Sequence, residues 1–138
     1  VYSAIAEIGL QIYKFGKTTT LAFPEKSYFP TSPYEVVMDN MKMGLHTLIL
    51  LDIKSEGDRY MTLNEGIKIL LEIEKQKKEK VFTEDTLCVG IARLGGDSFM
   101  RYGKAKELIN FDFGKPPHVI VVPGRLHFME EEALRRYL

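Results

Sequence analysis

The residues able to carry chemistry are few, and their spacing matches no common catalytic pattern. The three histidines, His46, His118 and His127, lack metal-binding spacing, and two of them open apolar runs. There is no phosphate-binding glycine loop and no nucleophile elbow. The single cysteine, Cys88, lies inside an apolar run, where a small buried residue is a more frequent role than a nucleophile. The residue types therefore predict no metal site and single out no catalytic group. A histidine at a strand start is expected to form hydrogen bonds there or to contact a ligand.

Three apolar runs must position any ligand-binding residue. They cover residues 45–53, 87–92 and 118–122. A run without polar residues at alternate positions is typical of a strand covered on both faces, as parallel strands are. Gly95-Gly96 follows the second run and Pro123-Gly124 ends the third, and glycine permits close approach of backbone to a ligand. Ligands of open α/β sheets bind at the carboxyl ends of strands. We therefore expect an α/β fold with a sheet of four to five strands, flanking helices and one functional edge.

Capping signals predict the helices between these strands. Residues 32–35 and 62–65 each have the Ser/Thr-x-x-Glu pattern of a capping box, the first with proline at the first helical position. Acidic residues 130–132 followed by Arg135 and Arg136 predict a last helix, because this order suits the helix dipole. Asp52 is expected to cap a turn, with contact to a ligand hydroxyl as the alternative. The other expected elements are a first helix after Ser3, a strand over 18–23, an edge strand or irregular segment over 97–103 and a short helix over 104–110.

Composition bounds the class of protein. A chain of 138 residues suits one domain. Nineteen basic residues balance nineteen acidic ones, so charge gives no argument for a nucleic-acid or membrane partner. No apolar run reaches the roughly 18 residues of a membrane span, and Glu7 and Gln11 interrupt any signal peptide. One cysteine agrees with a reducing compartment. The chain opens on Val1 rather than methionine, so we expect a piece of a longer protein.

Longer stretches of the sequence carry a resemblance to a known family. They cover residues 2–4, 9–16, 29–32, 44–48, 51–54, 60–62, 64–65, 82–83, 85–87, 92–93, 112–114, 116–118, 122–124 and 126–127. In residue identity and in order along the chain they resemble diphthine synthase, a family of S-adenosylmethionine-dependent methyltransferases with a tetrapyrrole methylase-like fold. The resemblance covers essentially all 138 residues. It implies that residues 1–138 are the second, C-terminal α/β domain of a two-domain fold whose N-terminal domain is absent here.

The resemblance also implies a cofactor site. The family holds S-adenosylmethionine in a cleft between its two domains, and its contacts on the second domain match Val1, Leu51, Leu94 and His118. Their mostly apolar character implies a slot for adenine with hydrogen bonds from the backbone. His118 is expected to contribute its backbone and is not expected to act as a base.

The implied reaction is methyl transfer to the amine of a modified histidine on translation elongation factor 2, which forms diphthine in diphthamide biosynthesis. A sulfonium methyl is already activated, so the protein mainly aligns the reactants and excludes water. That explains why no acid–base group stands out. The resemblance further implies a cytoplasmic homodimer, and the short connection 54–59 resembles the archaeal form. With half the cleft missing, residues 1–138 alone are expected to bind the cofactor poorly and to show no turnover.

One departure from the family and two alternatives stay open. The segment 95–104 is one residue shorter than in the archaeal relatives, which affects details beside Leu94. The alternatives are a non-catalytic α/β ligand-binding domain that uses the same edge, and a tetrapyrrole methylase of the same fold. Residues 13–16 and 51–54 resemble diphthine synthase more than the tetrapyrrole enzymes.

Overall fold

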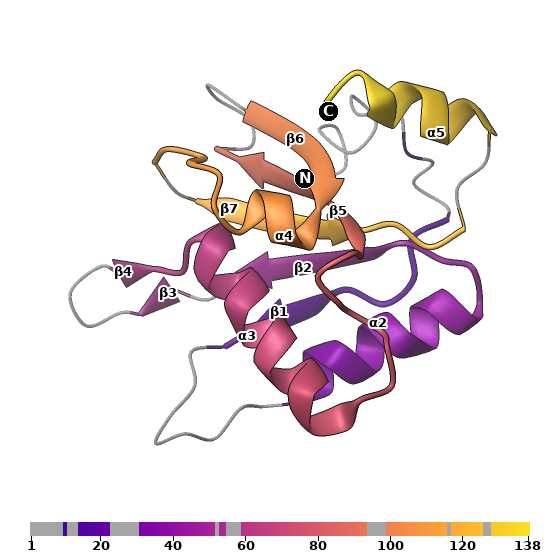
Figure 1. The fold of residues 1–138 in the computed structure, drawn as a ribbon, viewed down its shortest axis with the longest axis horizontal. Coiled ribbons are helices and arrows are strands. Elements are labelled where there is room, and N and C mark those ends of the chain that lie inside the picture. The colour runs from indigo at the N-terminus through magenta and orange to yellow at the C-terminus, as the bar shows by residue number, and fades with distance from the viewer. Residues whose placement is uncertain are drawn as a thin grey trace.

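A computed structural model describes residues 10, 14–22, 31–51, 53–54, 59–93, 99–115, 117–125 and 128–138. The described part is an α/β fold built on one five-stranded mixed sheet with helices on both faces (Figure 1). None of the helices in it is long and apolar enough to cross a membrane. The expected first helix after Ser3, the expected role of Asp52 and the residue His127 fall outside the described residues.

The sheet has the strand order β1-β2-β7-β5-β6. Its strands are β1 (Thr19–Leu21), β2 (Thr47–Leu51), β7 (His118–Val122), β5 (Leu87–Ala92) and β6 (Phe99–Lys104). β1 and β2 are parallel, and every other pair of neighbours is antiparallel. The expected strand over 45–53 is in fact two elements, because β2 ends at Leu51 and a separate β3 (Ile53–Lys54) pairs with β4 (Arg59–Tyr60).

The prediction that the three buried strands are parallel is wrong. β7 runs opposite to both β2 and β5. Their continuous apolar character has another cause, which is that side chains pack on both faces of the sheet. One cluster joins Ile49 and Ile120 to the helices on the first face, and a second joins Val89 and Val121 to a helix on the other. A strand buried on both faces is apolar throughout whatever its direction.

The first face is covered by α2 (Ser32–Lys42), α3 (Leu63–Lys77) and α4 (Ala105–Leu108), with α2 and α3 side by side (Figure 1). The predicted capping box of α3 is confirmed: the Thr62 hydroxyl accepts from the Glu65 N–H, and the Glu65 carboxylate accepts from the Thr62 N–H. In the first turn of α3, the side-chain amide of Asn64 donates to three carbonyls at the end of α4, those of Leu108, Ile109 and Phe111.

The predicted capping box at residues 32–35 is wrong. Ser32 is already helical, and Thr31 is the N-cap without a side-chain hydrogen bond. The Thr31 carbonyl accepts from the Glu35 N–H at 3.1 Å, so the helix begins one residue earlier than the box requires. The backbone bond then takes the donor that a Ser32 hydroxyl would have capped.

The second face is covered by α5 (Phe128–Arg135), whose Leu134 joins the second core cluster. The helix starts two residues before the expected Glu130, and that carboxylate is buried. It accepts from Lys14 Nζ and His46 Nε2, each at 2.8 Å. Nδ1 of His46 accepts from the Gly124 N–H at 2.9 Å. The side chains of Glu130 and His46 therefore tie α5 to the beginning of β2 and the end of β7.

Gly90 in β5 lets the first face pack closely. A Cβ at this position would lie 2.5 Å from Leu63 Cδ1 and 2.6 Å from Phe113 Cζ. Two segments far apart in the chain, the first turn of α3 and the segment after α4, therefore rest on the middle of β5. Cys88, in the same strand, is fully buried as predicted, and burial raises the pKa of its thiol to about 12.

Candidate functional site

One edge of the sheet brings together strand ends from distant parts of the chain. The register pairs Leu21 with Leu51 and Ala92 with His118. Leu50 pairs with Val119, so Leu51 and His118 are the next positions on the two neighbouring strands. The carboxyl ends of β2 and β5 and the amino end of β7 thus lie next to one another, on the side toward which the β2 arrow points and where β3 and β4 lie (Figure 1).

The reversed direction of β7 changes which residues reach this edge. Pro123-Gly124 was expected here as the end of a parallel strand, and it lies at the opposite edge, where Gly124 contacts His46. His118 lies at the candidate edge because it opens β7. Of the four residues that the resemblance implies, Leu51 and His118 are therefore brought together. Val1 and Leu94 lie outside the described residues.

Leu51 supplies apolar surface at this edge. Its side chain is half-buried and packs against the first core cluster. A Cβ on Gly66 of α3 would lie 3.0 Å from Leu51 Cδ2, so a glycine at that point lets the helix approach the strand end. The exposed part of Leu51 is available to an apolar ring stacked on the edge.

His118 is committed to the scaffold through both ring nitrogens. Its side chain is nearly inaccessible, with the residue 3% exposed. Nδ1 accepts from the Leu63 N–H at 3.0 Å, and Nε2 lies 3.1 Å from the Gly114 carbonyl oxygen. Because Nδ1 accepts, Nε2 carries the proton and donates to Gly114. Burial is the main influence on the ring and lowers the pKa of His118 below its ordinary value, against the opposing effect of the bond to Gly114. The ring is neutral and has no free nitrogen to act as a base.

Arg93, the last described residue of its segment, holds the neighbouring loop. Its N–H donates to the Pro117 carbonyl at 2.7 Å, and its guanidinium Nη1 donates to the carbonyls of Phe113 at 2.9 Å and Lys115 at 2.7 Å. Arg93 has a left-handed backbone with φ 55°, and Gly114 lies opposite it with φ 77°. Sequence reasoning did not assign a role to this arginine; its only signal was the Ala92-Arg93 pair within the resemblance.

Aromatic rings close the β6 side of the edge. Phe99, paired with Ala92, stacks on Phe111 with ring centroids 5.6 Å apart, and Phe113 contacts both rings edge to face. Phe113 also lies 6.0 Å from the His118 ring. Among the described residues of the candidate edge, Leu51, Phe99 and Phe111 therefore leave apolar surface exposed, while the His118 ring and the Arg93 guanidinium are bonded to backbone groups.

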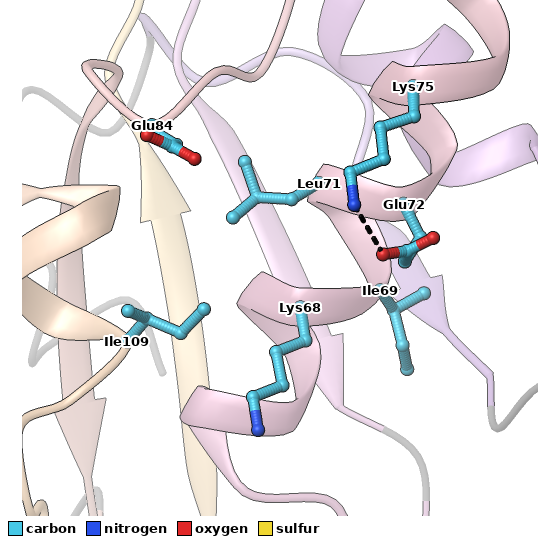
Figure 2. A pocket seen from close by; sticks show the side chains of 7 residues that line it. All are labelled: Lys68, Ile69, Leu71, Glu72, Lys75, Glu84 and Ile109. Carbon is cyan, nitrogen blue, oxygen red and sulfur yellow. Dashed lines mark hydrogen bonds and ion pairs between the residues drawn. The ribbon is translucent and has the colours of Figure 1, made fainter.

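Three surface hollows of the described residues lie away from this edge, the smallest of them, about 290 Å³, on α5. Figure 2 shows the first, about 490 Å³ in volume, between α3 and the end of α4. The second, about 520 Å³, lies where α2 meets the end of α3. None of the three is lined by Leu51 or His118. In the first, Lys75 is paired with Glu72 at 3.0 Å, and Leu71 and Ile109 form apolar walls (Figure 2). Within the described ranges, no three His, Cys, Asp or Glu side chains are grouped to hold a metal ion.

No protein-family model matches the chain, but named relatives do. Diphthine synthase from Methanocaldococcus jannaschii is 55% identical over an alignment of 138 positions, which covers 98% of this chain and 54% of the relative. Diphthine synthase from Methanococcus maripaludis is 54% identical over 136 residues, 98% of this chain and 53% of the relative. A solved structure of a putative diphthine synthase from Entamoeba histolytica superimposes with a TM-score of 0.92 at 38% identity, covering 98% of this chain and 55% of that one. A second solved structure of a diphthine synthase superimposes with a TM-score of 0.80 at 33% identity. The match covers 98% of this chain and 49% of that one.

The chain therefore has the α/β fold of one half of a larger enzyme chain. It is homologous to diphthine synthase, and it spans about half the length of the curated relatives that it matches.

Proposed function

We propose that this chain is the C-terminal domain of an S-adenosylmethionine-dependent methyltransferase of diphthamide biosynthesis. The enzyme methylates the amine of the modified histidine on translation elongation factor 2 and so forms diphthine. The observation that carries the proposal is 55% identity to a diphthine synthase, sustained over 98% of the chain. A tetrapyrrole methylase or a non-catalytic ligand-binding domain finds no such support among the relatives named above.

The cofactor site is proposed at the candidate edge, with contacts from Val1, Leu51, Leu94 and His118. The described residues fit an adenosyl group, since Leu51 offers half-buried apolar surface at the end of β2. The His118 ring is engaged through both nitrogens, so His118 contributes through its backbone. When bound, S-adenosylmethionine supplies an activated methyl group.

The residues of this chain then act by alignment. Leu51 and the aromatic rings beside β6 exclude water from the edge, and His118 holds the first turn of α3 in place. The half of the relatives' length that this chain does not span is proposed to supply the facing wall of the cleft. Residues 1–138 alone are accordingly proposed to bind the cofactor weakly and to lack turnover.

The proposal also covers the source, the cellular location and the oligomeric state of the enzyme. The two curated relatives come from Methanocaldococcus and Methanococcus, which supports an archaeal source. A cytoplasmic homodimer is proposed, and the exposed apolar side chains Met129 and Leu138 offer surface for a subunit contact.

Calorimetric titration of S-adenosylhomocysteine into the intact protein that contains this chain tests the site. Leu51→Arg and Leu94→Arg are each expected to weaken binding by more than about tenfold, because a charged side chain would replace apolar surface at the edge. Leu87→Arg is the matched control: Leu87 is 42% exposed at the other end of β5, so this variant should bind as the parent does. Thermal melts verify that all three fold. Absence of binding by the folded parent would contradict the proposal.

Transfer of labelled methyl groups to elongation factor 2 carrying the modified histidine tests the reaction. Mass spectrometry of the product histidine counts the methyl groups added. If a tetrapyrrole is labelled and elongation factor 2 is not, the result would contradict the proposal and would favour a tetrapyrrole methylase.

A further inference from the structure

Arg93 joins two segments that border the candidate edge. Its backbone N–H is bonded to Pro117, and its guanidinium is bonded to the carbonyls of Phe113 and Lys115. One side chain therefore spans the loop between α4 and β7, while its own backbone leads directly into Leu94. The loop cannot shift relative to the end of β5 without breaking these bonds.

Hydrogen bonds also connect this loop to β7 and to α3. The Gly114 carbonyl, which lies between the two carbonyls that Arg93 binds, accepts from His118 Nε2. His118 Nδ1 in turn accepts from the Leu63 N–H in the first turn of α3. A continuous chain of hydrogen bonds thus runs from the end of β5 through the loop and β7 to the helix.

The backbone of Arg93 is left-handed, with φ 55°. Left-handed geometry is costly for a residue with a Cβ, and glycine would adopt it without strain. An arginine at φ 55° therefore requires compensation, which the two carbonyl bonds of the guanidinium provide. Both bonds leave from one nitrogen, Nη1, which is one covalent bond further from the backbone than the Nζ of a lysine, so lysine keeps the charge with a shorter reach.

We propose that Arg93 is a positioning residue for the cofactor: it holds the end of β5, next to Leu94 in the sequence, against the loop that leads into His118. The proposal rests on the proposed function, because these two residues are proposed cofactor contacts. Arg93 itself acts through the loop and is not assigned a contact with the reacting atoms.

Binding of S-adenosylhomocysteine to the intact protein, measured by calorimetry, tests this role. Arg93→Ala is expected to raise Kd roughly five- to tenfold with the stoichiometry unchanged. This factor corresponds to the net free energy of about one hydrogen bond. Arg93→Lys should lie between Arg93→Ala and the parent. Gly114→Ala perturbs the same contact from the other side, since its Cβ would lie 3.0 Å from Arg93 Nη1 at φ 77°, and should weaken binding as well. Arg135→Ala, an exposed arginine on α5, is the matched control and should bind like the parent.

The outcomes separate positioning from simple stabilisation. A positioning role raises Kd, and in the methyl-transfer assay it raises KM for the cofactor while kcat stays near that of the parent. A lower stoichiometry at unchanged Kd, or parent-like binding by folded Arg93→Ala, would overturn the role and leave the proposed function standing. If Arg93→Ala does not fold, Arg93→Lys and Gly114→Ala decide by the same criterion. No binding by the parent would overturn the proposed function, and this role with it.

Discussion

Replacement of Glu130 by alanine should be among the most destabilising single changes on α5. The residue is 1% exposed, and its carboxylate accepts from Lys14 Nζ and His46 Nε2 at 2.8 Å each. Alanine would leave the buried Nε2–H of His46 without this acceptor and would take the counter-charge from Lys14. Loss of one partner from a buried polar group is costly because the other partner stays desolvated.

The structure sets the size of the effect. An unsatisfied buried donor costs about 1–3 kcal/mol, and breaking a buried ion pair costs about 3–5 kcal/mol. Two features make the cost of breaking this ion pair smaller than about 3–5 kcal/mol. Lys14 is 20% exposed and can turn to water, and burial lowers the pKa of His46, so that ring is neutral at pH 7. We therefore expect a loss of about 2–4 kcal/mol for Glu130→Ala and about 1 kcal/mol for Glu130→Gln, which keeps an acceptor.

Urea unfolding at pH 7, followed by circular dichroism, measures this loss. With a slope of about 2 kcal/mol/M, the midpoint should fall by roughly 1–2 M. Glu131→Ala is the matched control on the same helix. The Glu131 side chain is 49% exposed and pairs with Arg135 at 3.0 Å in an i,i+4 arrangement, so the loss should stay below about 0.5 kcal/mol. Equal losses for the two variants would refute the argument that burial decides the value of this carboxylate.

Three further outcomes follow from the packing. Gly90→Ala should cost about 1–3 kcal/mol by overpacking, whereas Gly103→Ala, whose Cβ would have its nearest neighbour at 3.6 Å, should be close to neutral in the same urea assay. Burial lowers the pKa of both His46 and His118, so the unfolded chain binds protons that the folded chain does not, and stability should fall as the pH drops below about 6.5. A urea midpoint that rose between pH 7 and pH 5.5 would contradict this sign. Asn64→Ala should speed amide hydrogen exchange at the end of α4, since its side chain caps three carbonyls there; unchanged exchange would show that the cap is dispensable.

Strand positions followed from the sequence, but strand directions did not. The predicted strands at 87–92 and 118–122 have the bounds of β5 and β7, because turn residues and charged residues limit both apolar runs. An apolar run reports burial on two faces and carries no information about direction. The parallel assumption placed Gly124 at the functional edge, whereas the resemblance placed His118 there. The antiparallel β7 puts Gly124 at the opposite edge and brings His118 beside Leu51.

The two capping boxes show why local motifs succeed unevenly. Thr62 has an extended backbone before α3, so its hydroxyl is free to meet the Glu65 N–H. Ahead of α2, the Thr31 carbonyl already accepts from the Glu35 N–H, and the same motif is left without its donor. Which residue begins a helix depends on the chain before it, and the motif itself does not contain that information.

The polar contacts that fix the two edges of the sheet were beyond sequence reasoning, because they join residues far apart in the chain. Glu130 lies 116 positions from Lys14 and 84 from His46. Arg93 binds carbonyls 20 and 22 positions away. Nothing in the local pattern around any of these residues signals its partner, and only the topology places them together.

The two buried histidines do equivalent work at opposite edges. In each ring Nδ1 accepts a backbone N–H, from Gly124 for His46 and from Leu63 for His118, and Nε2 donates to an oxygen. Both are thereby held as neutral tautomers, and neither can take a proton without losing a backbone bond. A reaction that used either of these two rings as a base would cost one of these backbone bonds. Methyl transfer from an activated donor requires alignment above all, so a sheet edge at which His118 and Arg93 are bonded to backbone groups suits the proposed chemistry.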